Sequence, residues 1–204
     1  MLDAMDVARH LIRIGSGTTD PAEAILICPL RLQKLLYYCQ GWALALLDRP
    51  LFPQSLEAWP KGPVVPEVYR EFPATHDPIT PARAGEPVGR LTQTEAALVE
   101  MVWKEYACHP PQRLIEMTHS EPAWREARGS LGENEPSSAP LSHQTMAEYF
   151  REVARKRAEH AGRPGFPVVD PIRVWQAEEE IERTGGAGAS AEDVFGPLLS
   201  SPAD

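Results

Sequence analysis

The stretch LQKLLYYCQGWALALLDRPLF (residues 32–52) carries the strongest periodic signal in this sequence. The apolar residues on its main stripe are Leu32, Leu35, Leu36, Cys39, Trp42, Ala43 and Leu46. Their successive spacings of 3, 1, 3, 3, 1 and 3 predict a helix that buries a wide face. The opposite side is partly apolar as well, through Tyr37, Tyr38, Leu44 and Leu47. A helix that is apolar on several sides is usually central to its domain.

Three residues inside this helix indicate how it is packed. Gly41 costs about 1 kcal/mol relative to alanine in a helix interior, so we expect another backbone to approach closely there. Trp42 lies on the main stripe and is expected in the core. Cys39 also lies on that stripe, where a thiol is normally inert, so a nucleophile paired with His109 or His119 is not favoured.

The next stretch, EAWPKGPVVPEVYREF (residues 57–72), places three prolines around an aromatic ring and a pair of valines. Residues 51–60 predict a short edge strand that Pro60 ends, and Gly62-Pro63 predicts a turn. Pro66 suits the first position of a helix. The segment therefore predicts a rigid strand–turn–helix corner. Such corners are usually structural, but they also make good binding rims because a stiff surface loses little entropy on docking.

The remaining periodic segments are helical. A helix is predicted over residues 3–14, and Thr92 with Glu95 forms a capping box ahead of another. Short helices are expected over residues 114–118 and around Trp124, and Ser142 starts a further one.

The predicted fold class is mainly α: a compact multi-helix domain with a small β element near residues 51–60. We expect this domain to span residues 1–155. An acidic C-terminal extension follows over residues 156–204, with a helix expected over residues 171–183 and a flexible end.

The charge balance restricts the kind of partner. The chain of 204 residues has a net charge of −9, which argues against nucleic acid as a direct ligand. Its densest basic stretch, residues 151–157, is typical of a solvated helix face. Residues 161–204 hold eight acidic and three basic side chains, a net contribution of −5. A basic protein partner suits this balance, because opposite charge raises association rates.

The sequence shows no signal peptide and no stretch long enough to span a bilayer. Its three cysteines include no CxxC pair. We therefore expect a cytoplasmic protein with reduced thiols and no membrane contact.

Catalytic and metal-binding motifs are absent from the sequence. It contains no P-loop, GxGxxG, GxSxG, HExxH or paired CxxC, and Cys108-His109 has no second pair to complete a metal site. His119 and Glu121, with Arg125 nearby, have the residue types of an acid–base cluster. A capping network at a helix junction is the favoured interpretation, because Ser120 and Glu121 suit that role. The sequence thus predicts no catalytic residue, no metal and no cofactor.

The two stretches quoted above resemble the Panacea domain of SocA-like antitoxins, which are found in bacteria and their phages. LVEMVWKEYA (98–107), LIEMTHSEPAWREAR (114–128) and TMAEYF (145–150) follow the same family's pattern in the same order. The resemblance runs from about the first helix to about residue 153. Cys39 stands where the family often has a small residue such as alanine, which supports a packing role for it.

The resemblance implies a predominantly helical domain with a small β element. It also implies an antitoxin that neutralises a toxin, usually encoded beside it, by direct protein contact. The residues that we expect to form or support the interface are Lys34, Tyr37, Tyr38, Trp59, Lys61, Tyr69 and His119. For both tyrosines and for Trp59, burial in the core and exposure at a protein contact are equally compatible with the sequence.

Three alternatives stay open at this point. The family also implies an adaptor role, in which the antitoxin delivers its toxin to a AAA+ protease. An enzyme of an undescribed class would use His119 and Glu121. A regulator of its own promoter is disfavoured, because the sequence offers no basic recognition helix.

Overall fold

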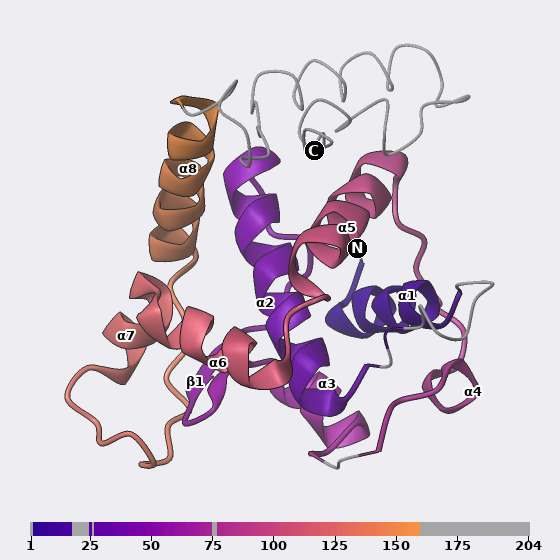
Figure 1. Cartoon of the computed structure of the whole chain (residues 1–204), viewed down its shortest axis with the longest axis horizontal. Helices are drawn as coiled ribbons and strands as arrows, with labels where there is room; N and C mark the ends of the chain where they lie inside the picture. Colours follow the sequence, from indigo (N-terminus) through magenta and orange to yellow (C-terminus); the bar gives the residue numbers. More distant parts are fainter. Residues whose placement is uncertain (1, 18–24, 26, 75–76, 160–204) are drawn as a thin grey trace.

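The computed structural model describes residues 2–17, 25, 27–74 and 77–159, which form eight helices and one two-stranded sheet (Figure 1). The helices are α1 (Ala4–Ser16), α2 (Pro29–Leu46), α3 (Pro66–Glu71), α4 (Pro81–Ala84), α5 (Gln93–Tyr106), α6 (Pro111–Ser120), α7 (Pro122–Arg128) and α8 (His143–Glu159). The strands are β1 (Glu57–Trp59) and β2 (Gly62–Val64). The predicted mainly helical fold with a small β element is confirmed. The helix expected over residues 171–183 lies outside the described residues.

Helix α2 is the centre of the molecule, as its sequence predicts. It lies between α8 and α5 in Figure 1, and it also contacts α1, α3, α6 and β2. All of its residues from Leu32 to Leu46 are buried. Trp42 is fully buried and its Nε1 donates a hydrogen bond to the Tyr106 hydroxyl, 3.1 Å away. Cys39 is also fully buried, and this burial raises the pKa of its thiol, so the expected packing role is confirmed.

Gly41 marks the crossing of α2 and α8. A Cβ atom added at Gly41 would lie 2.1 Å from Cε2 of Phe150, a side chain of α8. The expected close approach is therefore present, but it is made by an aromatic ring and not by another backbone. The Phe150 ring occupies the space that a side chain at position 41 would fill.

The β element is shorter than predicted and its turn lies elsewhere. Strand β1 pairs antiparallel with β2 in the register Glu57↔Val64, Ala58↔Pro63 and Trp59↔Gly62. Pro60 and Lys61 form the turn, so the prediction of a turn at Gly62-Pro63 is wrong. Gly62 adopts a φ of 91°, which favours glycine, and this conformation lets it begin the second strand directly after the two-residue turn.

Buried polar side chains of α2 hold the segment that contains this hairpin. The Gln40 Oε1 accepts a hydrogen bond from the Leu51 N–H at 3.0 Å, and its Nε2 donates to the Phe52 carbonyl at 3.0 Å. One heptad earlier, the Gln33 Oε1 accepts from the Val65 N–H at 2.8 Å. These two glutamines satisfy buried backbone groups at both ends of the segment, which fixes its path across α2.

The outer helices follow their sequence signals with two differences. Thr92 and Glu95 form the predicted capping box of α5. The short helix α4 has no counterpart among the helices predicted from the sequence. The basic stretch of α8 is only partly solvated, since the Arg157 guanidinium lies 5.0 Å from the centre of the Trp42 ring and bonds to Glu105 at 2.8 Å.

Candidate partner-binding surface

Three of the seven predicted interface residues lie at the surface around the hairpin. Trp59 ends β1, Lys61 stands in the turn, and Tyr69 comes from α3. The Trp59 and Tyr69 rings are half-buried and meet edge to face, with their centroids 4.8 Å apart. Lys61 is exposed. The corner predicted from the sequence therefore presents two aromatic rings and one cation to solvent.

These residues line a groove of about 280 Å³, which we call the hairpin groove. Its lining comes from the first turn of α2, the hairpin and α3: Pro29, Leu30, Gln33, Lys34, Trp59, Pro60, Lys61, Val64, Tyr69 and Ala74. Most of this lining is apolar, and the charged residues among these described ones are the two lysines.

Lys34 supports the hairpin from below. Its side chain is 1% exposed, and its Nζ donates a hydrogen bond to the Pro63 carbonyl at 2.9 Å. Burial lowers the pKa of this amine to about 7. A Cβ atom at Gly62 would lie 2.8 Å from the same Nζ, so Lys34 fills the space beneath β2.

Tyr37 and Tyr38 lie in the core, which resolves the choice that the sequence left open. They are 0% and 1% exposed, and both hydroxyls donate hydrogen bonds to the Glu121 carboxylate, Tyr38 at 3.0 Å. The Tyr38 ring also stacks on Tyr106 with centroids 3.8 Å apart. Neither tyrosine can touch a partner in this conformation, and both are placed to support the surface from within.

Glu121 has a different role from the predicted one. It stands at the N-terminus of α7, but its side chain makes no capping hydrogen bond and reaches into the core instead. Burial raises the pKa of this carboxyl to about 7, although the hydrogen bonds from Tyr37 and Tyr38 act in the opposite direction. The expected capping network is therefore wrong for the Glu121 side chain.

His119 connects to the back of the hairpin through Trp124. The His119 and Trp124 rings are stacked, with centroids 3.8 Å apart and planes 10° from parallel. Trp124 Nε1 in turn donates a hydrogen bond to the Trp59 carbonyl at 2.9 Å. The histidine thus belongs, with Trp124, to the support of β1 from α6 and α7.

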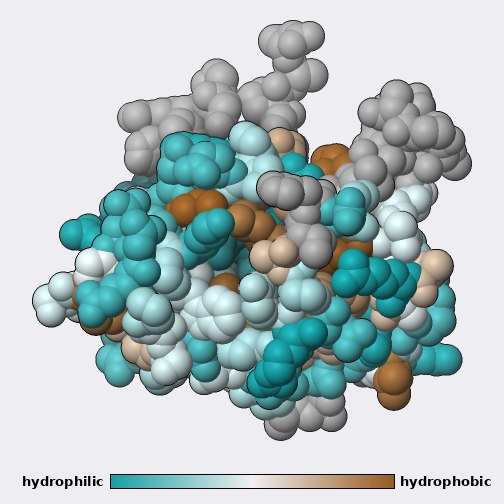
Figure 2. All heavy atoms as spheres, turned by 90° about the horizontal axis from the view of Figure 1, so that it is seen from below, coloured by the Kyte–Doolittle hydropathy of each residue, from teal (hydrophilic) through white to brown (hydrophobic). Residues whose placement is uncertain are grey.

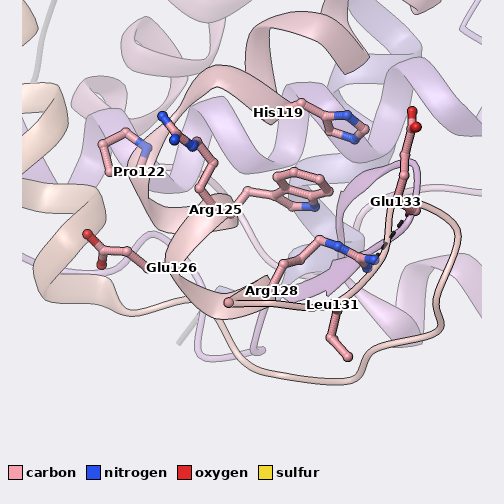
Figure 3. A pocket seen from close by; sticks show the side chains of 9 residues that line it. His119, Pro122, Arg125, Glu126, Arg128, Leu131 and Glu133 are labelled. Atoms are coloured by element: carbon pink, nitrogen blue, oxygen red, sulfur yellow. Dashed lines mark hydrogen bonds between the residues drawn. The ribbon is translucent and has the colours of Figure 1, made fainter.

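A second hollow of about 720 Å³ lies on this side, and His119, Arg125 and Arg128 are arranged around it in Figure 3. Arg128 was not singled out in the sequence. Its buried guanidinium donates to the carbonyls of Ala58 at 3.2 Å and Glu135 at 2.9 Å, which ties the loop after α7 to the hairpin. An arginine in the last turn of a helix is usually interpreted as a solvated charge, so the sequence gives no signal for the buried role of Arg128.

The geometry does not join His119 and Glu121 as an acid–base pair. Glu121 bonds to two tyrosines inside the core, whereas His119 stacks on Trp124 beside the second hollow. Within the described part of the chain, no group of three or more His, Cys, Asp or Glu side chains is placed to hold a metal ion. The helices of that same part include none with the length and apolar character needed to cross a bilayer.

Comparison with known proteins finds a similarity to one family over part of the chain. Residues 32–125 match the model of the family described as Antitoxin SocA-like, Panacea domain. A curated relative, Antitoxin SocA of Caulobacter vibrioides (strain NA1000 / CB15N), is 42% identical over 73 residues, which is 36% of this chain and 36% of the relative. The match thus spans about a third of that relative's length. No solved structure matches the chain. All seven predicted interface residues fall inside the matched range.

Proposed function

We propose that this protein is an antitoxin that neutralises a cognate toxin by direct contact, because residues 32–125 match the family model of the SocA-like antitoxins. The contact surface in this proposal is the corner formed by Trp59, Lys61 and Tyr69, with Lys34, Tyr37, Tyr38 and His119 supporting it. The family match is the observation that carries the proposal.

The stiffness of the corner supports this choice of surface. Trp59 is held by the Trp124 bond to its carbonyl, by the bond from its own Nε1 to Glu57 at 2.7 Å, and by its edge contact with Tyr69. A surface fixed in this way loses little conformational entropy when a partner binds. Tryptophan and tyrosine residues at a surface commonly dominate the free energy of protein–protein contacts.

The acidic balance of the chain agrees with a stoichiometric inhibitor of a basic protein. The net charge is −9, and residues 161–204 contribute −5 of it. In this proposal the extension covers a basic region of the toxin, and opposite charge speeds the encounter.

A growth-rescue experiment tests the proposal. The product of the adjacent reading frame is expressed under an inducible promoter, alone and together with the full chain. The account expects growth arrest by that product alone, rescue by the full chain, and loss of rescue with Trp59→Ala at unchanged antitoxin abundance. Lys104→Ala, at an exposed lysine of α5, is the matched control and is expected to rescue fully. Full rescue by Trp59→Ala would count against this surface, and an adjacent product that is harmless alone would count against the antitoxin role.

The same cells separate masking from delivery to a protease. Masking predicts an unchanged toxin half-life when the antitoxin is present. A toxin half-life that shortens severalfold would contradict simple neutralisation by binding.

A further inference from the structure

We infer that the hairpin groove receives an apolar side chain of the toxin that stands beside a carboxylate, with Lys61 pairing that carboxylate at the rim. This inference rests on the proposed antitoxin function and adds the chemistry of the partner segment. Its basis is the combination of an apolar lining, a basic rim and a rigid wall.

The apolar lining fits a single side chain of ordinary size. Pro29, Leu30, Trp59 and Tyr69 give the groove a hydrophobic lining, and its volume is about 280 Å³. On the face shown in Figure 2, hydrophilic residues cover most of the surface and hydrophobic ones appear only as small patches among them. A toxin that binds such a surface gains more from one inserted side chain than from a broad apolar contact.

The charge of the groove selects an acidic neighbour for that side chain. Among the described residues that line the groove, the charged side chains are those of Lys34 and Lys61, although the whole chain carries a net charge of −9. The Lys34 amine is buried and donates to Pro63, whereas Lys61 is exposed and forms no ion pair with any described residue. A basic rim on an acidic protein attracts a carboxylate of the partner and repels a lysine or arginine there.

The second hollow, beside His119, does not combine an apolar lining with charges of one sign. Its lining mixes Arg125 and Arg128 with Glu126 and Glu133, so it favours neither sign of charge. Most donors of the Arg128 guanidinium are already bonded to backbone carbonyls. The hairpin groove is therefore the better candidate for a specific anchor.

Carbodiimide coupling tests the ion pair directly. This reagent joins a lysine amine to a carboxylate in contact with it and leaves arginine unreacted. The full chain is mixed with the purified product of the adjacent reading frame, coupled, and digested for mass spectrometry. We expect a Lys61 cross-link to an aspartate or glutamate that lies within about three residues of a large apolar residue. The Lys61→Arg variant lacks the amine that the reagent couples, so this cross-link is expected to disappear, which assigns it to Lys61.

Binding measurements with matched variants complete the test. Lys61→Glu and Trp59→Ala are each expected to raise Kd at least about tenfold, because one reverses the rim charge and the other removes a groove wall. Lys104→Glu makes the same charge reversal on α5 and is expected to change Kd less than about threefold. Circular dichroism and urea midpoints confirm that each variant is folded before binding is compared.

The outcomes distinguish the proposed antitoxin function from the proposed role of the hairpin groove. If the parent chain does not bind the adjacent product, the proposed function falls and this inference falls with it. If the parent binds but Lys61→Glu and Trp59→Ala bind equally well, the antitoxin role stands and the groove is overturned. If Trp59→Ala weakens binding while Lys61 yields no cross-link and Lys61→Glu has no effect, the proposed pairing of Lys61 with a toxin carboxylate is wrong.

Discussion

Single residues decide how closely the central helix meets its neighbours. The Phe150 ring lies where a side chain at Gly41 would stand, and it also packs edge to face on Trp42, Tyr37 and Tyr38. The ring therefore has little freedom to move away. Glycine at this position lowers the helix propensity of α2 but allows α2 and α8 to cross closely.

Replacing Gly41 by alanine tests this balance. Alanine gains about 1 kcal/mol of helix propensity, but a contact at 2.1 Å in a packed core costs about 1–3 kcal/mol. We expect Gly41→Ala to lower the free energy of unfolding by up to about 2 kcal/mol in urea titrations. In a Phe150→Leu background the same change is expected to be neutral or stabilising, because the clash is gone and the propensity gain remains. A destabilisation of equal size in both backgrounds would contradict the account.

Glu121 gives the protein a distinctive pH dependence. Its folded pKa of about 7 lies above the ordinary value of 4.5, so the folded state keeps a proton that the unfolded state has already lost. Between about pH 4.5 and pH 7 the folded state thus binds more protons, and the contribution of Glu121 to stability falls as the pH rises. Above pH 7 that contribution stays constant.

Glu121→Gln removes this titration. We expect the parent to lose on the order of 3 kcal/mol relative to the variant between pH 4.5 and pH 7, measured as free energies of unfolding in urea. The difference between the two proteins also cancels the contributions of His10 and His119 to the pH dependence. The lowered pKa values of these histidines change stability in the opposite direction. A difference that does not vary with pH would show that Glu121 is already ionised in the folded protein.

At the scale of elements, α2 organises the hairpin through side chains that a purely apolar helix would lack. Gln33, Lys34 and Gln40 reach backbone groups of the segment that crosses α2. Each bond satisfies a buried donor or acceptor that the short strands leave open. The hairpin thus takes its rigidity from α2 more than from its own two-stranded pairing, since an isolated hairpin is marginal in water.

The Gln33→Leu variant tests how much α2 contributes to the rigidity of the hairpin. Leucine leaves the buried Val65 N–H without its acceptor, which costs about 1–3 kcal/mol. We expect amide hydrogen exchange to accelerate at β2 and the start of α3, while α5 exchanges as in the parent. Leu30→Gln, a change at a half-buried position of the same helix, serves as the control and is expected to leave β2 exchange unchanged. Equal exchange in the Gln33→Leu variant and the parent would contradict a holding role for α2.

These elements also show what the sequence could predict. The period of residues 32–46 was sufficient to predict α2 and its central place, and Thr92 with Glu95 was sufficient to locate the start of α5. The turn of the hairpin was missed because the φ of Gly62 depends on the space left by Lys34 and Thr118, which come from other helices.

The candidate surface was predicted less completely than the fold. The burial of Tyr37 and Tyr38 depends on Glu121, more than 80 residues away in the chain, and local periodicity carries no information about such a partner. Trp59, Lys61 and Tyr69 were found because proline, glycine and aromatic residues mark a stiff corner locally. Arg128 and the holding role of Gln33 depend on long-range backbone contacts that no short pattern encodes.

At the scale of the whole molecule, the described residues form a helical body with one stiff corner, which is the proposed contact surface. The core around α2 fixes the hairpin from below, and α6 and α7 fix it from the side through Trp124. The surface ion pairs of α8, such as Arg155 with Glu152, are exposed and contribute little to stability. This arrangement agrees with the proposed binding function, because hydrogen bonds from α2 and α7 and the ring contact from α3 converge on the hairpin.

Hydrogen exchange of the full chain with and without the purified toxin tests this central claim most directly. The account predicts that binding slows exchange over residues 57–72 and the first turn of α2, and leaves α4 and the exposed side of α5 unchanged. Slowed exchange confined to a surface remote from the hairpin would contradict it.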